Sequence, residues 1–237
     1  MSWLYLPERV ADYSPQNGCL DGGVCYVENA DYPVKVLQAR IRDGLLDDAP
    51  IWGDVRTFDG TPWRGCVDIV TAGFPCQPFS VAGQQQASDD DRNMWPDTIR
   101  VIRETRPTWC LLENVPGLLS ASHGYYGQIL RDLAESGYDA RWRVLSAAEV
   151  GAPHKRDRLF IVAYTKSKQW GEQKAWNRGQ VLTGRGAQGR PKNGWSTEPA
   201  LGRVADGIPH RLDRSEATGN GQVPAVVATV WRLLTEG

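Results

Sequence analysis

The sequence lacks the close cysteine pairs that hold zinc sites and small disulfide frameworks. Its five cysteines are odd in number and scattered, and no two of them stand in a Cys-x-x-Cys spacing. Neither kind of site is therefore indicated. The default expectation is a cytosolic protein with reduced thiols.

A long apolar run and a strong charge of either sign are also absent from the sequence. No apolar stretch approaches the roughly 18 residues that a membrane helix needs, and no signal peptide is recognisable, so we expect no membrane partner. The formal net charge of -1 excludes a generally basic nucleic-acid coat protein. It still allows a local basic patch.

The sequence does contain enough apolar material for one large folded unit. Hydrophobic residues make up 41% of the 237 residues, and there are ten tryptophans, which argues against a disordered chain. At this length we expect one large domain, or one domain with a small attachment.

Short apolar runs alternate with helical patterns along the chain. Strands are expected at 24–27, 67–70, 109–112, 141–146 and 159–163, with a strand stub at 3–6. Helices are expected at 31–45, 95–104, 125–135 and 225–234. The connection at 147–157 is too short for a crossover helix, so its flanking strands should be antiparallel. The pattern predicts a doubly wound α/β fold whose sheet is mostly parallel, with an antiparallel strand.

The stretch from Asp68 to Ser80 joins a strand candidate to two prolines that bracket a cysteine. Pro75 and Pro78 cannot continue the strand, so the chain must turn there. Ligands of open α/β sheets bind outside such strand ends, which makes Cys76 a candidate nucleophile. A free cysteine is more often a small buried hydrophobe, and this stretch alone leaves that alternative open.

Carboxylates stand at the ends of two other strand candidates, and another lies in a turn. Glu28 follows the first full strand, where an acidic side chain can accept hydrogen bonds from a ribose, and Glu113 follows the strand at 109–112. Asp54 lies in a turn at the sheet edge. As single features, Glu28 fits a solvated surface residue equally well, and Asp54 fits a turn former.

The expected antiparallel pairing brings four basic residues to the sheet edge of the thiol. They are His154, Lys155, Arg156 and Arg158. They would face the thiol pocket, and a solvated basic hairpin is the alternative.

The segment 166–192 has seven basic residues and one acid, with recurring glycines and tryptophans. It shows no helix or strand period. This composition is typical of a flexible nucleic-acid contact surface, and a plain basic linker is the alternative.

The order of several short stretches resembles that of the motifs of the DNA cytosine-5 methyltransferases. The stretches are Pro75-Cys76-Gln77, Glu113-Asn114-Val115, Arg156-Asp157-Arg158 and Gly219-Asn220, with weaker matches at 26–29 and at Gly53-Asp54. The resemblance covers most of the chain from about residue 24 onward. The family's opening strand with its Phe-x-Gly-x-Gly loop is not found, and residues 1–23 offer only Gly22-Gly23 in its place.

The resemblance implies a Rossmann-like methyltransferase fold and a role for each matching residue. The implied catalytic residues are Cys76, Glu113, Arg156 and Arg158. The implied binding residues for the cofactor S-adenosylmethionine are Glu28, Asn29, Asp54, Val55, Pro75, Asn220 and Gly221. The DNA-binding candidates are Gln77, Ser80, Lys168, Lys174, Arg178, Arg185 and Arg190. No metal ion is expected.

The implied reaction moves a methyl group from S-adenosylmethionine to C5 of a cytosine flipped out of duplex DNA, through a covalent Cys76 adduct. Glu113 has to be protonated for this chemistry, so we expect burial to raise its pKa. One alternative is a non-catalytic DNA-binding remnant that cannot hold the cofactor. A thiol enzyme acting on a small molecule is another.

The resemblance also implies an organisation and a setting. A catalytic core is expected at 1–165, a reduced basic DNA-recognition segment at 166–200 and a C-terminal return to the core at 201–237. Double-stranded DNA is the expected partner of a cytoplasmic monomer, in a bacterial or phage-infected cell. A cognate restriction endonuclease is one candidate functional partner, and phage self-protection and a regulatory or orphan role stay open.

Overall fold

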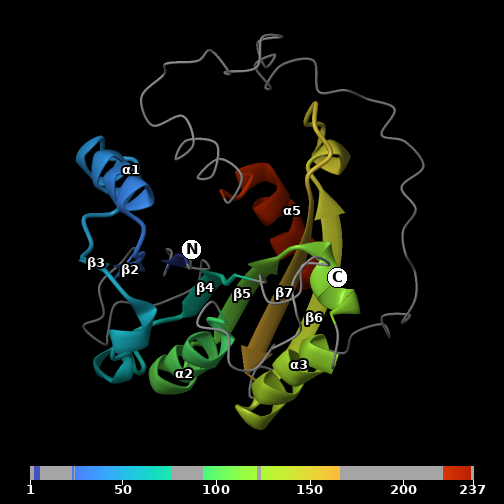
Figure 1. Cartoon of the computed structure of the whole chain (residues 1–237), viewed down its shortest axis with the longest axis horizontal. Coiled ribbons are helices and arrows are strands. Elements are labelled where there is room, and N and C mark those ends of the chain that lie inside the picture. The colour runs from blue at the N-terminus through green and yellow to red at the C-terminus, as the bar shows by residue number, and fades with distance from the viewer. Residues whose placement is uncertain are drawn as a thin grey trace.

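The computed structural model describes residues 3–5, 23, 25–75, 93–121, 124–165 and 221–235. Within these ranges, seven strands form one sheet in the order β3-β2-β1-β4-β5-β7-β6 (Figure 1). Their bounds are β1 (Trp3–Tyr5), β2 (Tyr26–Val27), β3 (Ile51–Trp52), β4 (Ile69–Gly73), β5 (Trp109–Asn114), β6 (Tyr138–Ser146) and β7 (Asp157–Thr165).

Four α-helices accompany the strands in the described part of the chain. They are α1 (Asp31–Arg42), α2 (Trp95–Thr105), α3 (Tyr125–Glu135) and α5 (Pro224–Thr235). The predicted helices are all confirmed, but α1 is shorter than its apolar pattern suggested. It ends at Arg42, so Leu45 lies outside it and is 66% exposed. No helix among the described residues is both long and apolar enough to cross a membrane.

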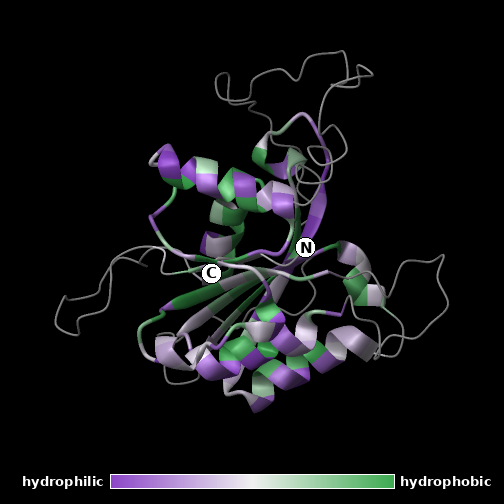
Figure 2. Cartoon of the chain, turned by 60° about the vertical axis from the view of Figure 1, so that its left-hand side comes forward, coloured by the Kyte–Doolittle hydropathy of each residue, from purple (hydrophilic) through white to green (hydrophobic). Residues whose placement is uncertain are grey.

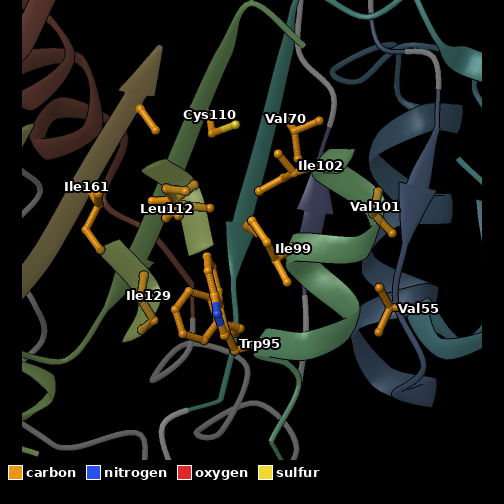
Figure 3. Packing of buried hydrophobic residues seen from close by; sticks show 14 of the residues in the cluster. Val55, Val70, Trp95, Ile99, Val101, Ile102, Cys110, Leu112, Ile129 and Ile161 are labelled. Carbon is orange, nitrogen blue, oxygen red and sulfur yellow. The ribbon is translucent and has the colours of Figure 1, made fainter. Parts of the chain in front are cut away.

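The helices cover both faces of the sheet (Figure 2). On one face, α2 and α3 contribute Ile99, Ile102 and Ile129 to a cluster that also contains Cys110 and Leu112 of β5 (Figure 3). On the other face, α5 packs through its apolar residues against the alternate residues of β5 and β7. Helix α1 covers β2 and β3 on this second side. The alternation of side chains along β5 therefore builds a three-layer α/β fold.

The direction of the strands confirms one expectation and corrects another. The long β6–β7 ladder is antiparallel, from Tyr138 opposite Thr165 to Ser146 opposite Asp157, as the short connection predicted. However, β1 also runs antiparallel to both of its neighbours, β2 and β4. The sheet thus has two reversed strands, β1 and β7, where one was expected. Periodicity gives a strand its faces but not its direction, so the sequence did not indicate this reversal.

The remaining strands β2 to β6 point the same way, so their carboxyl ends meet at one edge of the sheet. The antiparallel β7 begins at this same edge. Ligand sites of open α/β sheets lie outside the carboxyl ends of the strands. This edge therefore holds the candidate site.

Candidate active site

Glu113 is the central charged group of the candidate site. It belongs to β5 itself, within the strand and not after it, and its ladder partners are Gly73 of β4 and Phe160 of β7. Arg158 stands two residues before Phe160 and so lies on the same face of the sheet. Its Nε donates to Glu113 Oε1 at 2.9 Å, and both side chains are largely buried. The antiparallel pairing of β5 and β7 thus builds a buried ion pair.

Arg156 adds a second positive charge to this edge. Its backbone has a φ of +40°, and its Nη2 donates to the backbone oxygen of Gly221 just before α5. Desolvation and the neighbouring Arg158 lower the pKa of Arg156, whereas Glu113 raises it. This hydrogen bond brings one predicted cofactor residue, Gly221, to Arg156.

The pKa of Glu113 is raised above its ordinary value because burial penalises the charged form. Arg158 and Arg156 oppose this shift, but burial outweighs them. The direction agrees with the expectation for a carboxyl that must carry a proton when it acts.

This pKa shift predicts how stability depends on pH. Folded Glu113 keeps its proton above the ordinary pKa of 4.5, so its contribution to stability is complete below pH 4.5 and is lost as pH rises through the folded pKa. Relative to Glu113→Gln, which cannot titrate, the wild-type protein should lose unfolding free energy as pH rises. Urea unfolding of both proteins from about pH 4 to about pH 8 measures this difference. If the unfolding free energy of the wild-type protein minus that of Glu113→Gln stays flat or increases with pH, the assignment is contradicted.

The segment that leads to Cys76 is held at the end of β4 by two neighbouring elements. The Nδ2 of Asn114 donates to the backbone oxygen of Phe74 at 2.9 Å, and the Phe74 ring lies 5.2 Å from the ring of Trp95. A Cβ on Gly73 would stand 3.3 Å from Glu113 Oε2, so the backbone passes close to the carboxyl group. These contacts place the chain leading to the cysteine beside Glu113. Sequence reasoning assigned no role to Trp95 or to the Asn114 side chain, although the Asn beside Glu113 was a usable signal.

Glu28 is buried at the end of β2, with 1% of its surface exposed. The interpretation of Glu28 as a solvated surface residue is therefore wrong. Its Oε1 accepts from the N–H of Ala30 at 2.8 Å, while its buried Oε2 has no hydrogen-bond partner among the described residues. Burial raises the pKa of Glu28, and the Ala30 N–H opposes this. A buried acceptor without a donor is costly, so this atom fits a ligand hydroxyl.

Asp54 forms a turn after β3, as the turn interpretation predicted. Its Oδ1 accepts from the N–H of Arg56 at 2.9 Å, and Oδ2 lies 2.7 Å from Arg56 Nη2. These hydrogen bonds lower the pKa of Asp54. The next residue, Val55, is buried, and Asn29 beside Glu28 is exposed. The Asp54 carboxylate is thus already engaged by its own turn.

Of the basic residues expected at the thiol, only the two arginines approach Glu113. His154 is exposed, and Lys155 is largely exposed and pairs with Asp157 at 2.9 Å. Because the thiol and its loop lie outside the described residues, the expectation that His154 and Lys155 face its pocket stays a prediction.

Several predicted site residues lie outside the described part of the chain. They are Cys76, Gln77, Ser80, Lys168, Lys174, Arg178, Arg185, Arg190 and Asn220. Pro75, which is partly buried, is the last described residue before the cysteine. The recognition segment expected at 166–200 also falls outside.

Two of the three cysteines in the described ranges, Cys25 and Cys110, are poor candidates for a nucleophile because they are buried. Burial raises the pKa of Cys25 to about 11 and that of Cys110 further still, and Cys66 is exposed. Within the same ranges no group of three or more His, Cys, Asp or Glu side chains could hold a metal ion.

Comparison with known sequences shows similarity to Type II methyltransferases. The chain is 41% identical over 127 residues to the Type II methyltransferase M.NgoMIV of Neisseria gonorrhoeae, covering 52% of this chain and 40% of that protein. It is 36% identical over 129 residues to the Type II methyltransferase M.NaeI of Lentzea aerocolonigenes, covering 53% of this chain and 31% of the relative. The chain therefore spans less than half the length of these two curated relatives.

Comparison with solved structures supports the Rossmann-like fold. A crystal structure of Spodoptera frugiperda DNMT2 superposes with a TM-score of 0.51 at 19% identity, over 64% of this chain and 45% of that one. The model of the C-5 cytosine-specific DNA methylase family matches residues 22–200. Because this match takes in well over half of the 237 residues, and the strand edge carries Glu113 between two arginines, the chain belongs to the C-5 cytosine-specific DNA methylase family.

Proposed function

We propose that the chain is the catalytic core of a DNA cytosine-5 methyltransferase that uses S-adenosylmethionine. One observation carries the proposal: Glu113 is a buried carboxyl group with a raised pKa, paired with Arg158 and next to the backbone that leads to Cys76. A carboxyl group that keeps its proton can act as a general acid on a heterocyclic base. The family assignment supports the same chemistry.

In the proposed reaction, the Cys76 thiolate adds to C6 of the cytosine ring, and Glu113 gives a proton to N3. The electrons of the C5–C6 double bond move toward N3, which makes C5 nucleophilic. S-adenosylmethionine, when bound, supplies the electrophilic methyl group. The demethylated thioether of the cofactor would be the leaving group. Loss of the C5 proton to a base then expels the Cys76 thiolate, and N3 returns its proton to Glu113, which restores the ring. Nearby cations such as Arg156 and Arg158 favour the thiolate form.

The two arginines would also hold the substrate. A guanidinium presents donors in a fixed fork that suits a base oxygen or a phosphate, and this orientation keeps C6 within reach of the thiol. A stacked cytosine is inaccessible to Cys76, so the base has to be flipped out of the duplex. Gln77 and Ser80 would contact DNA beside the cysteine. The basic residues Lys168, Lys174, Arg178, Arg185 and Arg190 would contact the phosphates.

Glu28 is the best-supported cofactor residue. Within the described part of the chain its buried Oε2 lacks a donor, and a ribose hydroxyl would supply one. The other proposed cofactor residues are Asn29, Asp54, Val55, Pro75, Asn220 and Gly221. The carboxylate of Asp54 already pairs with Arg56, so it can accept a hydrogen bond from a ligand only by sharing that contact.

The proposal also covers how the chain is divided, what it acts on and where it acts. We propose a core at 1–165, a recognition segment at 166–200 and a return to the core at 201–237, acting as a monomer on double-stranded DNA in the cytoplasm. The Type II designation of the relatives supports a restriction endonuclease as the functional partner.

Calorimetric titration of S-adenosylmethionine tests the cofactor part of the proposal. We expect binding to the wild-type protein and a dissociation constant about tenfold higher for Glu28→Gln, which corresponds to about 1.4 kcal/mol. Glutamine keeps an oxygen for the Ala30 N–H but replaces the free acceptor with an amide donor.

Asp48→Asn is the matched control, because Asp48 is an exposed acid near the same strand. This variant should bind the cofactor like the wild-type protein. If the wild-type protein binds no cofactor at millimolar concentration, the methyltransferase proposal fails and the non-catalytic DNA-binding remnant takes its place.

A further inference from the structure

Helix α2 touches both sides of the proposed site. At its first residue, Trp95 packs against Phe74, which precedes the cysteine turn. Farther along, Arg100 and Glu104 reach the segment from Val55 to Gly60, which follows the cofactor candidate Asp54. Figure 3 shows Val55 in the same cluster as Ile99, Val101 and Ile102 of α2.

Arg100 binds the backbone of this segment at two points. Its Nη1 donates to the carbonyl oxygen of Phe58 at 2.7 Å, and its Nη2 donates to that of Val55 at 2.6 Å. These carbonyls stand at the two ends of the 3-10 turn Val55–Thr57. Hydrogen bonds from a charged donor are stronger than neutral ones, and the planar guanidinium fixes the spacing of both acceptors.

Glu104 completes the contact. Its Oε1 accepts from Arg100 Nη1 at 2.9 Å, and its Oε2 accepts from the N–H of Gly60 at 2.8 Å. A Cβ at Gly60 would stand 2.9 Å from Thr105 Cγ2, so the segment lies against α2 as closely as a glycine permits. The Arg100–Glu104 pair therefore binds three backbone groups within six residues.

The orientation of Asp54 depends on this segment. Asp54 caps the turn through the N–H of Arg56, and Val55 anchors the turn in the core. If the carbonyls of Val55 and Phe58 lose their donor, the turn loses two of the contacts that fix it relative to α2.

We infer that Arg100, held by Glu104, is a positioning residue for the methyl-donor cofactor: it fixes the Asp54–Val55 turn in the place from which these residues bind the cofactor. The inference rests on the proposed function. Arg100 acts on cofactor binding through the backbone of this turn, and it touches no reacting atom.

Two variants of Arg100 and one matched control test the inference. Arg100→Met removes both donors, whereas Arg100→Lys keeps the charge for Glu104 but cannot span both carbonyls. The control is Arg103→Met on the same helix, because Arg103 is exposed and its Nε donates to Ser136 Oγ at 2.9 Å.

We expect the dissociation constant for S-adenosylmethionine to rise about tenfold in Arg100→Met, less in Arg100→Lys, and to stay unchanged in Arg103→Met. At saturating cofactor, kcat of the Arg100→Lys protein should stay close to that of the wild-type protein, so that the defect appears in KM for the cofactor. Hydrogen exchange of the Gly60 amide should speed up in both Arg100 variants.

The inference is overturned if folded Arg100→Lys matches the Arg103→Met protein in cofactor affinity and in Gly60 exchange. If Arg100→Met does not fold, the comparison of Arg100→Lys with Arg103→Met tests the inference without it. A wild-type protein that binds no cofactor gives a different result, because then the proposed function fails and the inference falls with it.

Discussion

Replacing Cys76 with serine is expected to lower the rate of methyl transfer to duplex DNA by ~10⁴-fold or more, the scale on which loss of a covalent nucleophile acts in other enzymes. A serine hydroxyl is far less acidic than a thiol, so no oxyanion is available at neutral pH to add to C6. Cationic side chains beside such a group, the role proposed for Arg156 and Arg158, lower the energy of a thiolate but cannot ionise an alcohol at this pH. Incorporation of labelled methyl groups into duplex DNA measures the loss.

Cys66→Ser provides the matched control, because Cys66 is an exposed free thiol on the approach to β4. Its transfer rate should equal that of the wild-type protein. A Cys76→Ser protein that retains more than about a tenth of the wild-type rate would rule out the covalent role of Cys76.

Replacing Glu113 with glutamine is expected to lower kcat by about 10²- to 10⁴-fold, the usual contribution of a general acid. Glutamine can donate a hydrogen bond to N3 from nearly the same place, but it cannot transfer a proton. It also leaves Arg158 without its carboxylate partner. In the wild-type protein the raised pKa of Glu113 keeps the acid form to a higher pH, and kcat should fall as pH rises through this pKa.

Glu135→Gln tests whether loss of any carboxylate has this effect, because Glu135 is exposed at the end of α3. Its kcat and pH profile should match those of the wild-type protein. An alkaline fall of kcat that persists unchanged in Glu113→Gln would assign that ionisation to another group.

The sequence predicted those parts of the fold that depend on local pattern. The helices over 95–105 and 125–135 have apolar residues at helical spacing with proline or glycine at an end, and they form where expected. The antiparallel pairing of β6 and β7 followed from the length of one connection. From these features alone, Glu113 and Arg158 could be placed at the same sheet edge.

Other parts of the fold depend on contacts between distant residues, and the sequence pattern did not indicate them. The direction of β1 is set by its pairing with two neighbouring strands. Its three residues are too few to show a hydrophobic pattern, and no such pattern would specify the direction of the strand. Arg100 looked like an ordinary polar residue of a helix, yet it donates to carbonyls 42 and 45 residues away. From the sequence, Glu28 fitted a solvated surface residue and a ligand-binding residue equally well. Only its burial in the folded structure distinguishes these two interpretations.

Duplex DNA that carries 5-fluorocytosine at the target position can trap the proposed covalent intermediate on Cys76. Fluorine at C5 cannot leave as a proton does, so methyl transfer should leave the nucleotide attached to the cysteine sulfur through C6. We expect a covalent complex that forms only with S-adenosylmethionine, maps by mass spectrometry to the peptide containing Cys76 and is missing from Cys76→Ser. Methyl transfer to ordinary cytosine without any such adduct, or an adduct on another cysteine such as Cys66, would contradict the covalent role of Cys76.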